Sequence, residues 1–166
     1  MTAPPAWLPP LVLLASFGGD WERYVNALYA FYRQDFVERR PLFRGLRVGH
    51  KVRPVEDGKD ATFWHLVSEG RTEENRMPDL RRCERIRWPR PLIDHAEDAP
   101  IKVWENRRNR ETRICIWFQE IEYLVILAAR TGYVLLWTAY PVTEKHRRRK
   151  LQTEYEAYIK ANAAPL

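Results

Sequence analysis

The second half of the chain carries four apolar segments that follow one another too closely for helices to connect them. In segment 113–118 (RICIWF), isoleucine and phenylalanine alternate with Cys115 and Trp117, which is the two-residue period of a β-strand. The other segments cover 101–104, 123–129 and 133–140. Parallel strands need a crossover of roughly a dozen residues or more, and the connections here are shorter. This half of the chain therefore predicts an antiparallel β-meander.

Apolar residues at helical spacing predict further helices on either side of the meander. Asp20 is a suitable N-cap, and the apolar residues after it recur at helical spacing, so a helix is expected within 20–40. A helix rich in basic residues, opened by Thr143, is expected over 143–160. Strands are expected within 43–52 and 61–67, and a helix over 79–87. This order predicts an α+β fold, with an antiparallel sheet of four to six strands packed on helices.

A length of 166 residues suits one domain. Residues 1–19 are rich in proline, and we expect an irregular arm that packs Trp7 and residues 11–14 onto a single domain, 20–166, whose sheet and central helices occupy 43–142. The longest apolar stretch is interrupted by Arg130-Thr131-Gly132, so no membrane partner is expected. The two cysteines lack zinc-site spacing and are typical of reduced thiols in a cytoplasmic protein.

The positive charge is concentrated in three short windows. The chain holds 28 Lys and Arg against 22 Asp and Glu, and 22 of those cations are arginine. Windows 81–90, 102–113 and 145–150 carry +4, +3 and +5, which leaves −6 for the rest of the chain. Trp88, Trp104 and Trp117 lie within or beside these windows. Arginine beside aromatic rings favours contact with phosphates and unpaired bases, so the windows indicate a surface that binds nucleic acid. The alternative is a set of solvated faces that never meet in space.

Motifs of the common nucleotide-binding and metal-dependent enzymes are missing from the sequence. The seven glycines form neither a dinucleotide-binding fingerprint nor a P-loop, and no Gly-x-Ser-x-Gly elbow is present. No set of histidines and acidic residues has the spacing of metal ligands. We therefore expect a protein that uses no metal and no cofactor.

His65 is the strongest candidate for proton transfer. It lies in TFWHLV, where strand alternation places it on the face of Phe63 and Val67, with a loop close behind. An imidazole titrates near neutral pH, and near a sheet edge it can act as a general base on a bound ligand. The alternative is a core histidine that hydrogen-bonds a neighbouring carbonyl.

Thr138 and Tyr140 form a second candidate cluster. They are two residues apart in the last predicted strand, so their hydroxyls emerge on one face near its end. The basic helix begins directly afterwards, and its first residues include Lys145, His146, Arg149 and Lys150. Hydroxyls, a helix N-terminus and basic side chains together are typical of a phosphate-binding corner. The alternative is a tyrosine packed at the edge of the sheet.

Three arginines form the third cluster. Arg81 and Arg85 share one face of the helix predicted over 79–87, and Arg82 lies beside them. These side chains either clamp a phosphate or pair with Glu84 within one helical turn.

Cleavage of a phosphodiester without a metal points to RNA, whose 2′-hydroxyl can attack the adjacent phosphorus. The protein then supplies a proton acceptor, a proton donor and cations for the charge that develops on the phosphoryl oxygens. His65, the hydroxyls of Thr138 and Tyr140, and the arginines contain all of these groups.

Several segments resemble the phage-associated branch of the barnase–EndoU–colicin–RelE-like nucleases. They are TFWHLV, RRCERIRWPRPLI, IKVWENRR, TRICIWF, YLVILAARTGYVLLWTAYPV and HRRRKLQTEYE, and they cover about residues 60–160. The resemblance implies a small, metal-independent, toxin-like ribonuclease with an antitoxin or immunity protein as its partner. It implies a catalytic position for His65, and catalytic or phosphate-contacting roles for Arg81 or Arg82, Thr138 and Tyr140. No second catalytic histidine matches, so the general acid stays open among Tyr140, Lys145 and His146.

Three functions remain open at this point, and one of them is an interaction protein whose basic face binds an acidic partner such as an antitoxin; the other two differ in whether RNA is cleaved. The first is an endoribonuclease, which predicts that His65, Arg81, Thr138 and Tyr140 converge on one cleft; scatter over more than about 15 Å would exceed the reach of proton transfer and phosphate contact and would exclude the site. The second is a non-catalytic module that binds nucleic acid or a phage component through the same surface of arginine and tryptophan. The second function predicts binding that weakens steeply with salt, and no cleavage of any RNA.

Overall fold

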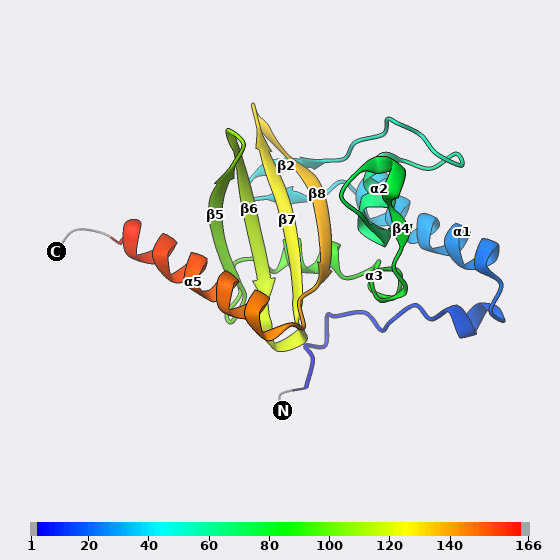
Figure 1. The fold of residues 1–166 in the computed structure, drawn as a ribbon, viewed down its shortest axis with the longest axis horizontal. Coiled ribbons are helices and arrows are strands. Elements are labelled where there is room, and N and C mark those ends of the chain that lie inside the picture. Colours follow the sequence, from blue (N-terminus) through cyan, green and yellow to red (C-terminus); the bar gives the residue numbers. More distant parts are fainter. Residues whose placement is uncertain (1–2, 164–166) are drawn as a thin grey trace.

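The computed structural model describes residues 3–163, an α+β protein built on a curled six-stranded sheet (Figure 1). The strands stand in the order β1-β2-β8-β7-β6-β5. Their bounds are Leu42–Phe43, Leu46–Gly49, Lys102–Arg108, Glu111–Phe118, Tyr123–Arg130 and Tyr133–Pro141 for β1, β2, β5, β6, β7 and β8.

The predicted meander is confirmed, because β5, β6, β7 and β8 pair consecutively and antiparallel. The first part of the sheet departs from the prediction. Segment 43–52 supplies only β2 and part of the hairpin β1–β2, and β2 lies parallel to β8. That parallel pairing joins only Val48 to Val134 and Gly49 to Leu135, so β8 has no partner from β2 beyond Leu135.

Three helices lie where the sequence predicts them, with shifted ends. Helix α1 (Trp21–Tyr32) begins after Asp20, whose side chain accepts from the Arg23 amide, and a π-helical turn continues it to Glu38. Pro78 ends the short strand β4 (Met77–Pro78), and Asp79 caps the helix that follows it. The other two are α3 (Leu80–Glu84) and α5 (Lys145–Ala161), which begins two residues after Thr143, whereas α4 (Pro89–Asp94) lies outside the predicted helices. Among residues 3–163, none of the helices has the length and apolar character needed to cross a membrane.

Residues 61–67 form helix α2 (Ala61–Val67), so the strand predicted there is wrong. Its buried positions Phe63, Leu66 and Val67 follow the helical period. Aromatic and β-branched residues favour a strand locally, but a short apolar run is ambiguous, and here packing against α1 and β8 decides the outcome. His65 consequently lies on the side of the helix opposite Phe63 and Val67, not on their face.

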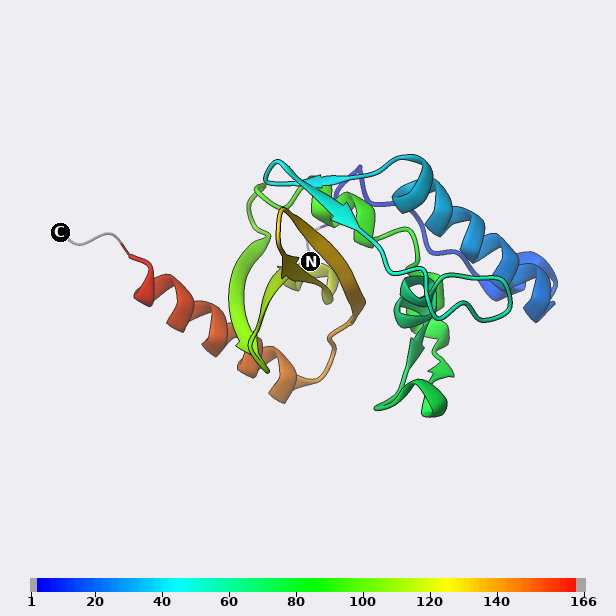
Figure 2. The ribbon, with the colours of Figure 1, turned by 90° about the horizontal axis from the view of Figure 1, so that it is seen from above.

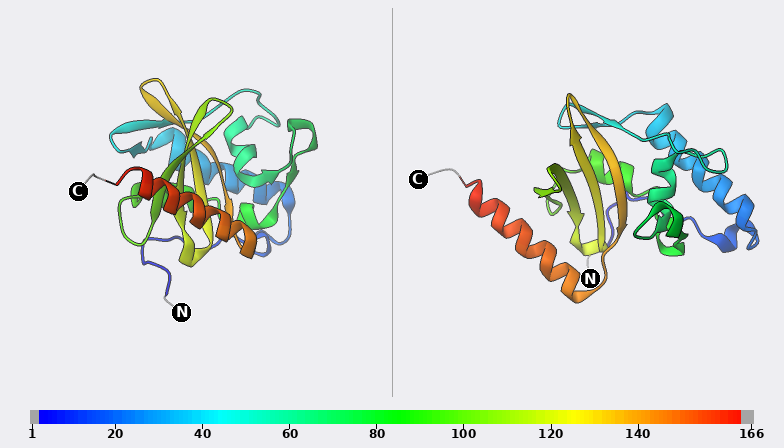
Figure 3. Two further views of the ribbon diagram at one scale, coloured as in Figure 1. Left: turned by 60° about the vertical axis from the view of Figure 1, so that its left-hand side comes forward. Right: turned by 45° about the horizontal axis from the view of Figure 1, so that its top comes forward.

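Helices cover both faces of the sheet, and each face has its own apolar cluster. The larger cluster joins α1, α2 and α4 to one face and includes Phe63, Ile116 and Val125. The smaller cluster lies beneath α5 and includes Trp104, Trp117 and Leu151. Figure 2 shows α5 on one side of the curled sheet and α1 on the other, and the right-hand view of Figure 3 shows the same separation.

A β-bulge in β8 changes which side chains face each cluster. Ile126 pairs with Thr138 and Leu127 pairs with Leu136, which leaves Trp137 as the extra residue. Leu136 therefore belongs to the larger core, whereas Tyr140, four residues later, packs with the cluster beneath α5. Without the bulge, strict alternation would place both on one face.

The N-terminal arm lies along the body of the protein. Trp7 stacks on His95 with ring centroids 4.1 Å apart, and the Trp88 indole donates to the Pro9 carbonyl. The backbone amide of Val12 donates to Glu84 of α3. These contacts attach the proline-rich segment to both α3 and α4.

Asp60 joins α1 to the start of α2. It is 8% exposed, and its two carboxylate oxygens accept from the hydroxyls of Tyr29 (3.2 Å) and Tyr32 (3.1 Å). Burial, together with the Asp60 carboxylate, raises the pKa of Tyr32 far above its ordinary value of 10.0, so this hydroxyl remains a donor. The pair of hydrogen bonds therefore holds the residue from which α2 begins.

We expect Asp60→Ala to lower the free energy of unfolding by about 1–3 kcal/mol, because it leaves the buried Tyr32 hydroxyl without an acceptor. Urea denaturation measures the change. Adding Tyr32→Phe removes the orphaned hydroxyl, so the double variant should lose less than the two single losses combined. Asp57→Asn in an exposed turn is the control. An Asp60→Ala protein as stable as this control would show that the network does not hold α2.

Candidate functional site

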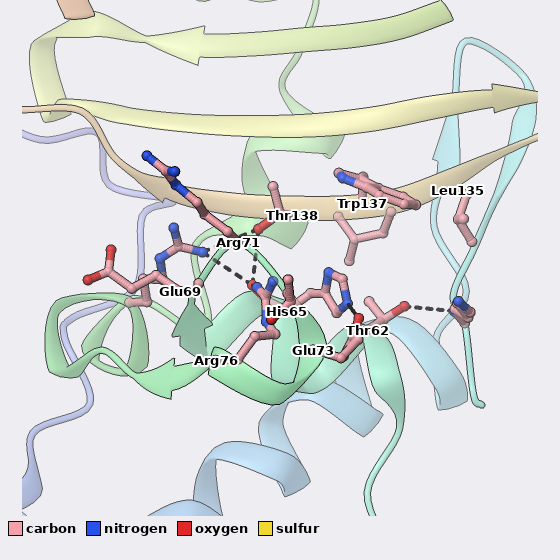
Figure 4. A pocket seen from close by; sticks show the side chains of 14 residues that line it. Thr62, His65, Glu69, Arg71, Glu73, Arg76, Leu135, Trp137 and Thr138 are labelled. Carbon is pink, nitrogen blue, oxygen red and sulfur yellow. Dashed lines mark hydrogen bonds and ion pairs between the residues drawn. The ribbon is translucent and has the colours of Figure 1, made fainter. Parts of the chain in front are cut away.

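A cavity of about 570 Å³ lies beside the part of β8 that β2 leaves unpaired. One wall is β8, from Leu135 to Thr138, and the opposite wall is α2 with the segment that follows it. Figure 4 shows His65 and Glu73 meeting on this opposite wall, with Trp137 and Thr138 on the strand facing them. The titratable side chains that line the cavity are Lys51, His65, Glu69, Arg71, Glu73, Arg76 and Arg82.

A short hairpin supplies most of these charged groups. Strands β3 (Ser68–Glu69) and β4 (Met77–Pro78) pair, and the loop between them carries Arg71, Glu73 and Arg76. Gly70 opens the loop with φ near +155°, and a Cβ there would lie 2.7 Å from the Asn75 carbonyl oxygen. Only glycine fits so close to the returning backbone, so the loop's tight path depends on this residue.

His65 and Glu73 form a hydrogen-bonded pair in the cavity. His65 Nε2 lies 2.8 Å from Glu73 Oε1, and the imidazole meets the Trp137 ring edge to face, at 5.9 Å between centroids. Burial is the main cause that lowers the pKa of His65 below its ordinary value of 6.5, and the Arg76 charge adds to it, while Glu73 partly opposes both. The imidazole is therefore neutral at pH 7, and donating Nε2–H to Glu73 leaves Nδ1 as the proton acceptor.

The backbone carbonyl of His65 accepts hydrogen bonds from two of the predicted site residues. The Thr138 hydroxyl donates to it at 3.0 Å, and the Arg82 guanidinium donates at 3.3 Å and also to the Ser68 carbonyl at 2.9 Å. Arg76 adds a third donor at 3.4 Å. Thr138 and Arg82 thus hold the C-terminal end of α2 in place. Both line the cavity, but both also use hydrogen-bond donors on backbone carbonyls.

Tyr140 and Arg81 line a second cavity of about 410 Å³, which shares Glu69 and Arg82 with the first. Arg147 of α5 donates to the Tyr140 hydroxyl at 2.9 Å. The guanidinium of Arg82 lies over the Tyr140 ring, 5.0 Å from its centroid. The predicted site residues therefore divide between two adjoining cavities, with His65 and Thr138 in one, Arg81 and Tyr140 in the other, and Arg82 between them.

The other predicted phosphate-binding residues lie elsewhere. Arg85 turns back to donate to the Arg81 carbonyl and covers the Trp88 ring. Lys145, His146 and Arg149 are exposed on α5 and line neither cavity. Lys150 lines a third cavity, beneath α5. Among the basic residues of α5, Arg147 and Lys150 line the second or third of these cavities.

Sequence reasoning missed several lining residues. Glu73, Arg71 and Arg76 fall in a polar stretch with no recognisable motif, and only the hairpin brings them opposite β8. Trp137 lies in the segment WTAYPV, but no sequence pattern placed it in a site. Its exposure to the cavity depends on the β-bulge, which no local pattern indicates.

The first cavity combines a neutral imidazole, four cations and an aromatic ring. Lys51, Arg71, Arg76 and Arg82 outnumber the carboxylates Glu69 and Glu73, so the site attracts an anion. Among residues 3–163, no three His, Cys, Asp or Glu side chains are grouped to hold a metal ion. Comparisons with known protein families, curated proteins and solved structures found no match for this chain.

Glu73→Gln should lower the pKa of His65 further, because it removes the carboxylate charge that favours the imidazolium. An NMR titration of the imidazole C–H resonances measures this shift. We expect the wild-type pKa below 6.5, and a lower value in the variant. Glu74→Gln, an adjacent exposed carboxylate, is the control and should leave the wild-type value unchanged.

The same pKa predicts how stability depends on pH. Folding favours the neutral imidazole, so this contribution is fully present above pH 6.5 and is lost as the pH falls through the folded-state pKa. A His65 pKa at or above 6.5, or an upward shift in Glu73→Gln, would contradict the arrangement.

Proposed function

We propose that this protein is a metal-independent endoribonuclease of the toxin type. The observation that carries the proposal is the neutral His65 imidazole, held by Glu73 in a cavity whose cations outnumber its carboxylates. A neutral imidazole is the form that accepts a proton, and the cations suit a phosphate group. The exposed part of Trp137 beside them offers a surface on which an unpaired base can stack.

In the proposed reaction, His65 takes the proton from the 2′-hydroxyl of the RNA. The 2′-oxygen then bonds to the adjacent phosphorus, and the bond from phosphorus to the 5′-oxygen of the next nucleotide breaks. The products are a 2′,3′-cyclic phosphate and a 5′-hydroxyl, and the leaving oxygen receives a proton. Glu73 stabilises the imidazolium that forms, and Arg71 and Arg76 face the charge on the phosphoryl oxygens.

Tyr140 is the proposed proton donor to the leaving oxygen. Its hydroxyl accepts from Arg147, so its own proton is available to another acceptor, and its cavity adjoins that of His65. Lys145 and His146 lie outside both cavities, which favours Tyr140 among the three candidates. Arg81 lies in the same cavity as Tyr140 and is placed to contact the next phosphate.

Thr138 and Arg82 act in this scheme as positioning residues. Their hydrogen bonds to the His65 carbonyl set where α2 ends and therefore where the imidazole lies. The proposal extends to a RelE-like or barnase-like nuclease fold and to an antitoxin as partner, which the quoted sequence segments support. The exposed cations of α5 suit an acidic partner surface.

A non-catalytic RNA-binding module is the second candidate. Arg76 and Arg82 donate to backbone carbonyls that hold the fold. Because these hydrogen bonds occupy donors that catalysis would need for the charge on the phosphoryl oxygens, they favour binding without cleavage. Both candidates predict binding that weakens with salt, so binding alone does not separate them.

Cleavage of total RNA in the presence of EDTA tests the proposal. We expect His65→Ala to lower the rate at least about a hundredfold, which is the usual contribution of general base catalysis. Tyr140→Phe should lower it to a similar degree, and Thr138→Val less. His95→Ala, a histidine outside these cavities, is the matched control, with each variant's melting temperature checked.

A defined oligonucleotide with one 2′-deoxy residue gives the second readout. The cleavage site should become resistant when its own 2′-hydroxyl is missing, and unmodified RNA should yield cyclic phosphate ends. Equal cutting by wild type and His65→Ala would overturn the mechanism. Salt-sensitive binding with no cutting would favour the binding module.

A further inference from the structure

A third cavity, of about 240 Å³, lies between the sheet and α5. It shares Trp137 and Thr138 with the His65 cavity, so the two lie on either side of the β8 bulge. Its floor is formed by Cys115, Leu124 and Ile126, and Leu151 closes it from α5. This volume is below that of a site for a drug-sized ligand and suits a single small ring system.

Asn106 in this cavity has an unused hydrogen-bonding group. Its Oδ1 is buried and has no partner among residues 3–163, while Nδ2 has only the Cys115 sulfur, at 3.7 Å. A sulfur atom is a weak acceptor, so neither orientation of the amide gives both polar atoms a strong partner. Buried polar groups are nearly always hydrogen-bonded, so an unpartnered oxygen that lines a cavity is a group that a bound ligand can satisfy.

Aromatic rings and cations surround the same cavity. The Arg113 guanidinium lies 4.0 Å from the centroid of the Trp137 ring, and Tyr140 is a second aromatic wall. Arg108, Arg147 and Lys150 add positive charge, against a single lining carboxylate, Glu154. Proteins hold an unpaired base and its phosphate with three features: an amide that can both donate and accept, aromatic walls, and cations at the mouth of the pocket.

We propose that this cavity binds one unpaired nucleobase of RNA, with Asn106 hydrogen-bonding to the edge of the base. The inference rests on the proposed ribonuclease and adds to it a subsite for the nucleotide beside the phosphate at His65. Arg147 and Lys150 hold the phosphate of that nucleotide at the mouth of the cavity. Asn106 thereby makes cleavage depend on the identity of the base.

Titration of the full-length protein with each of the four nucleoside 3′-monophosphates tests the site, with tryptophan fluorescence as the readout. We expect at least one nucleotide to bind, and Asn106→Leu to weaken that binding about tenfold, as the loss of a paired contact to a base edge does. Ile126→Phe, which fills the floor of the cavity, should weaken it similarly. Asn26→Leu on the exposed face of α1 is the matched control and should bind as the wild type does.

Thermal unfolding separates this role from a structural one. Asn106→Leu removes a buried group without a strong partner, so we expect its melting temperature to equal or exceed that of the wild type. A structural asparagine would instead cause a lower melting temperature, which counts against the proposal. Wild type that binds no mononucleotide at millimolar concentration, or variants that bind as tightly as wild type, would overturn it.

Cleavage of an RNA containing every dinucleotide distinguishes this proposal from the ribonuclease itself. Cleavage whose base preference is lost in Asn106→Leu supports both. Unaltered preference in that variant leaves the ribonuclease standing and overturns the base pocket. Mononucleotide binding that depends on Asn106, with no cleavage by any form, overturns the ribonuclease and keeps the pocket as a nucleotide-binding site.

Discussion

The carbonyl oxygen of His65 is the junction on which the site depends. It lies in the last turn of α2, where helix carbonyls lack intrahelical partners, and the Thr138 hydroxyl and two guanidinium groups satisfy it. Because Thr138 belongs to β8 and Arg82 to α3, this one atom links three elements that are distant in sequence. The imidazole on the same residue is placed by these contacts, and the cavity takes its shape from them.

The edge of β8 makes room for both cavities beside it. Strand β2 pairs with only two of its residues, so the strand continues past Leu135 without a neighbour on that side. The bulge at Trp137 then turns the following residues toward α5. Trp137 and Thr138 of this one strand therefore line both the His65 cavity and the cavity beneath α5. The proposed catalytic group and the proposed base pocket are neighbours for this reason.

Much of the sheet and little of the site could be predicted from the sequence. The strands from Lys102 to Pro141 were predicted because alternation and short connections are local properties. His65 was selected for the chemistry of its side chain, and Thr138 and Arg82 for reasons of phosphate contact, whereas in the fold they hold a backbone carbonyl. The partner of His65 was missed, since Glu73 comes from a loop with no periodicity.

The sequence by itself determined the meander, the flanking helices and the windows of positive charge, because each depends on residues a few positions apart. Only the tertiary structure decided that 61–67 is a helix, since Asp60 and the tyrosines of α1 hold its start across about thirty residues. It also decided which arginines reach a cavity and which remain exposed on α5. Those outcomes depend on contacts between distant segments, and no local pattern encodes such contacts.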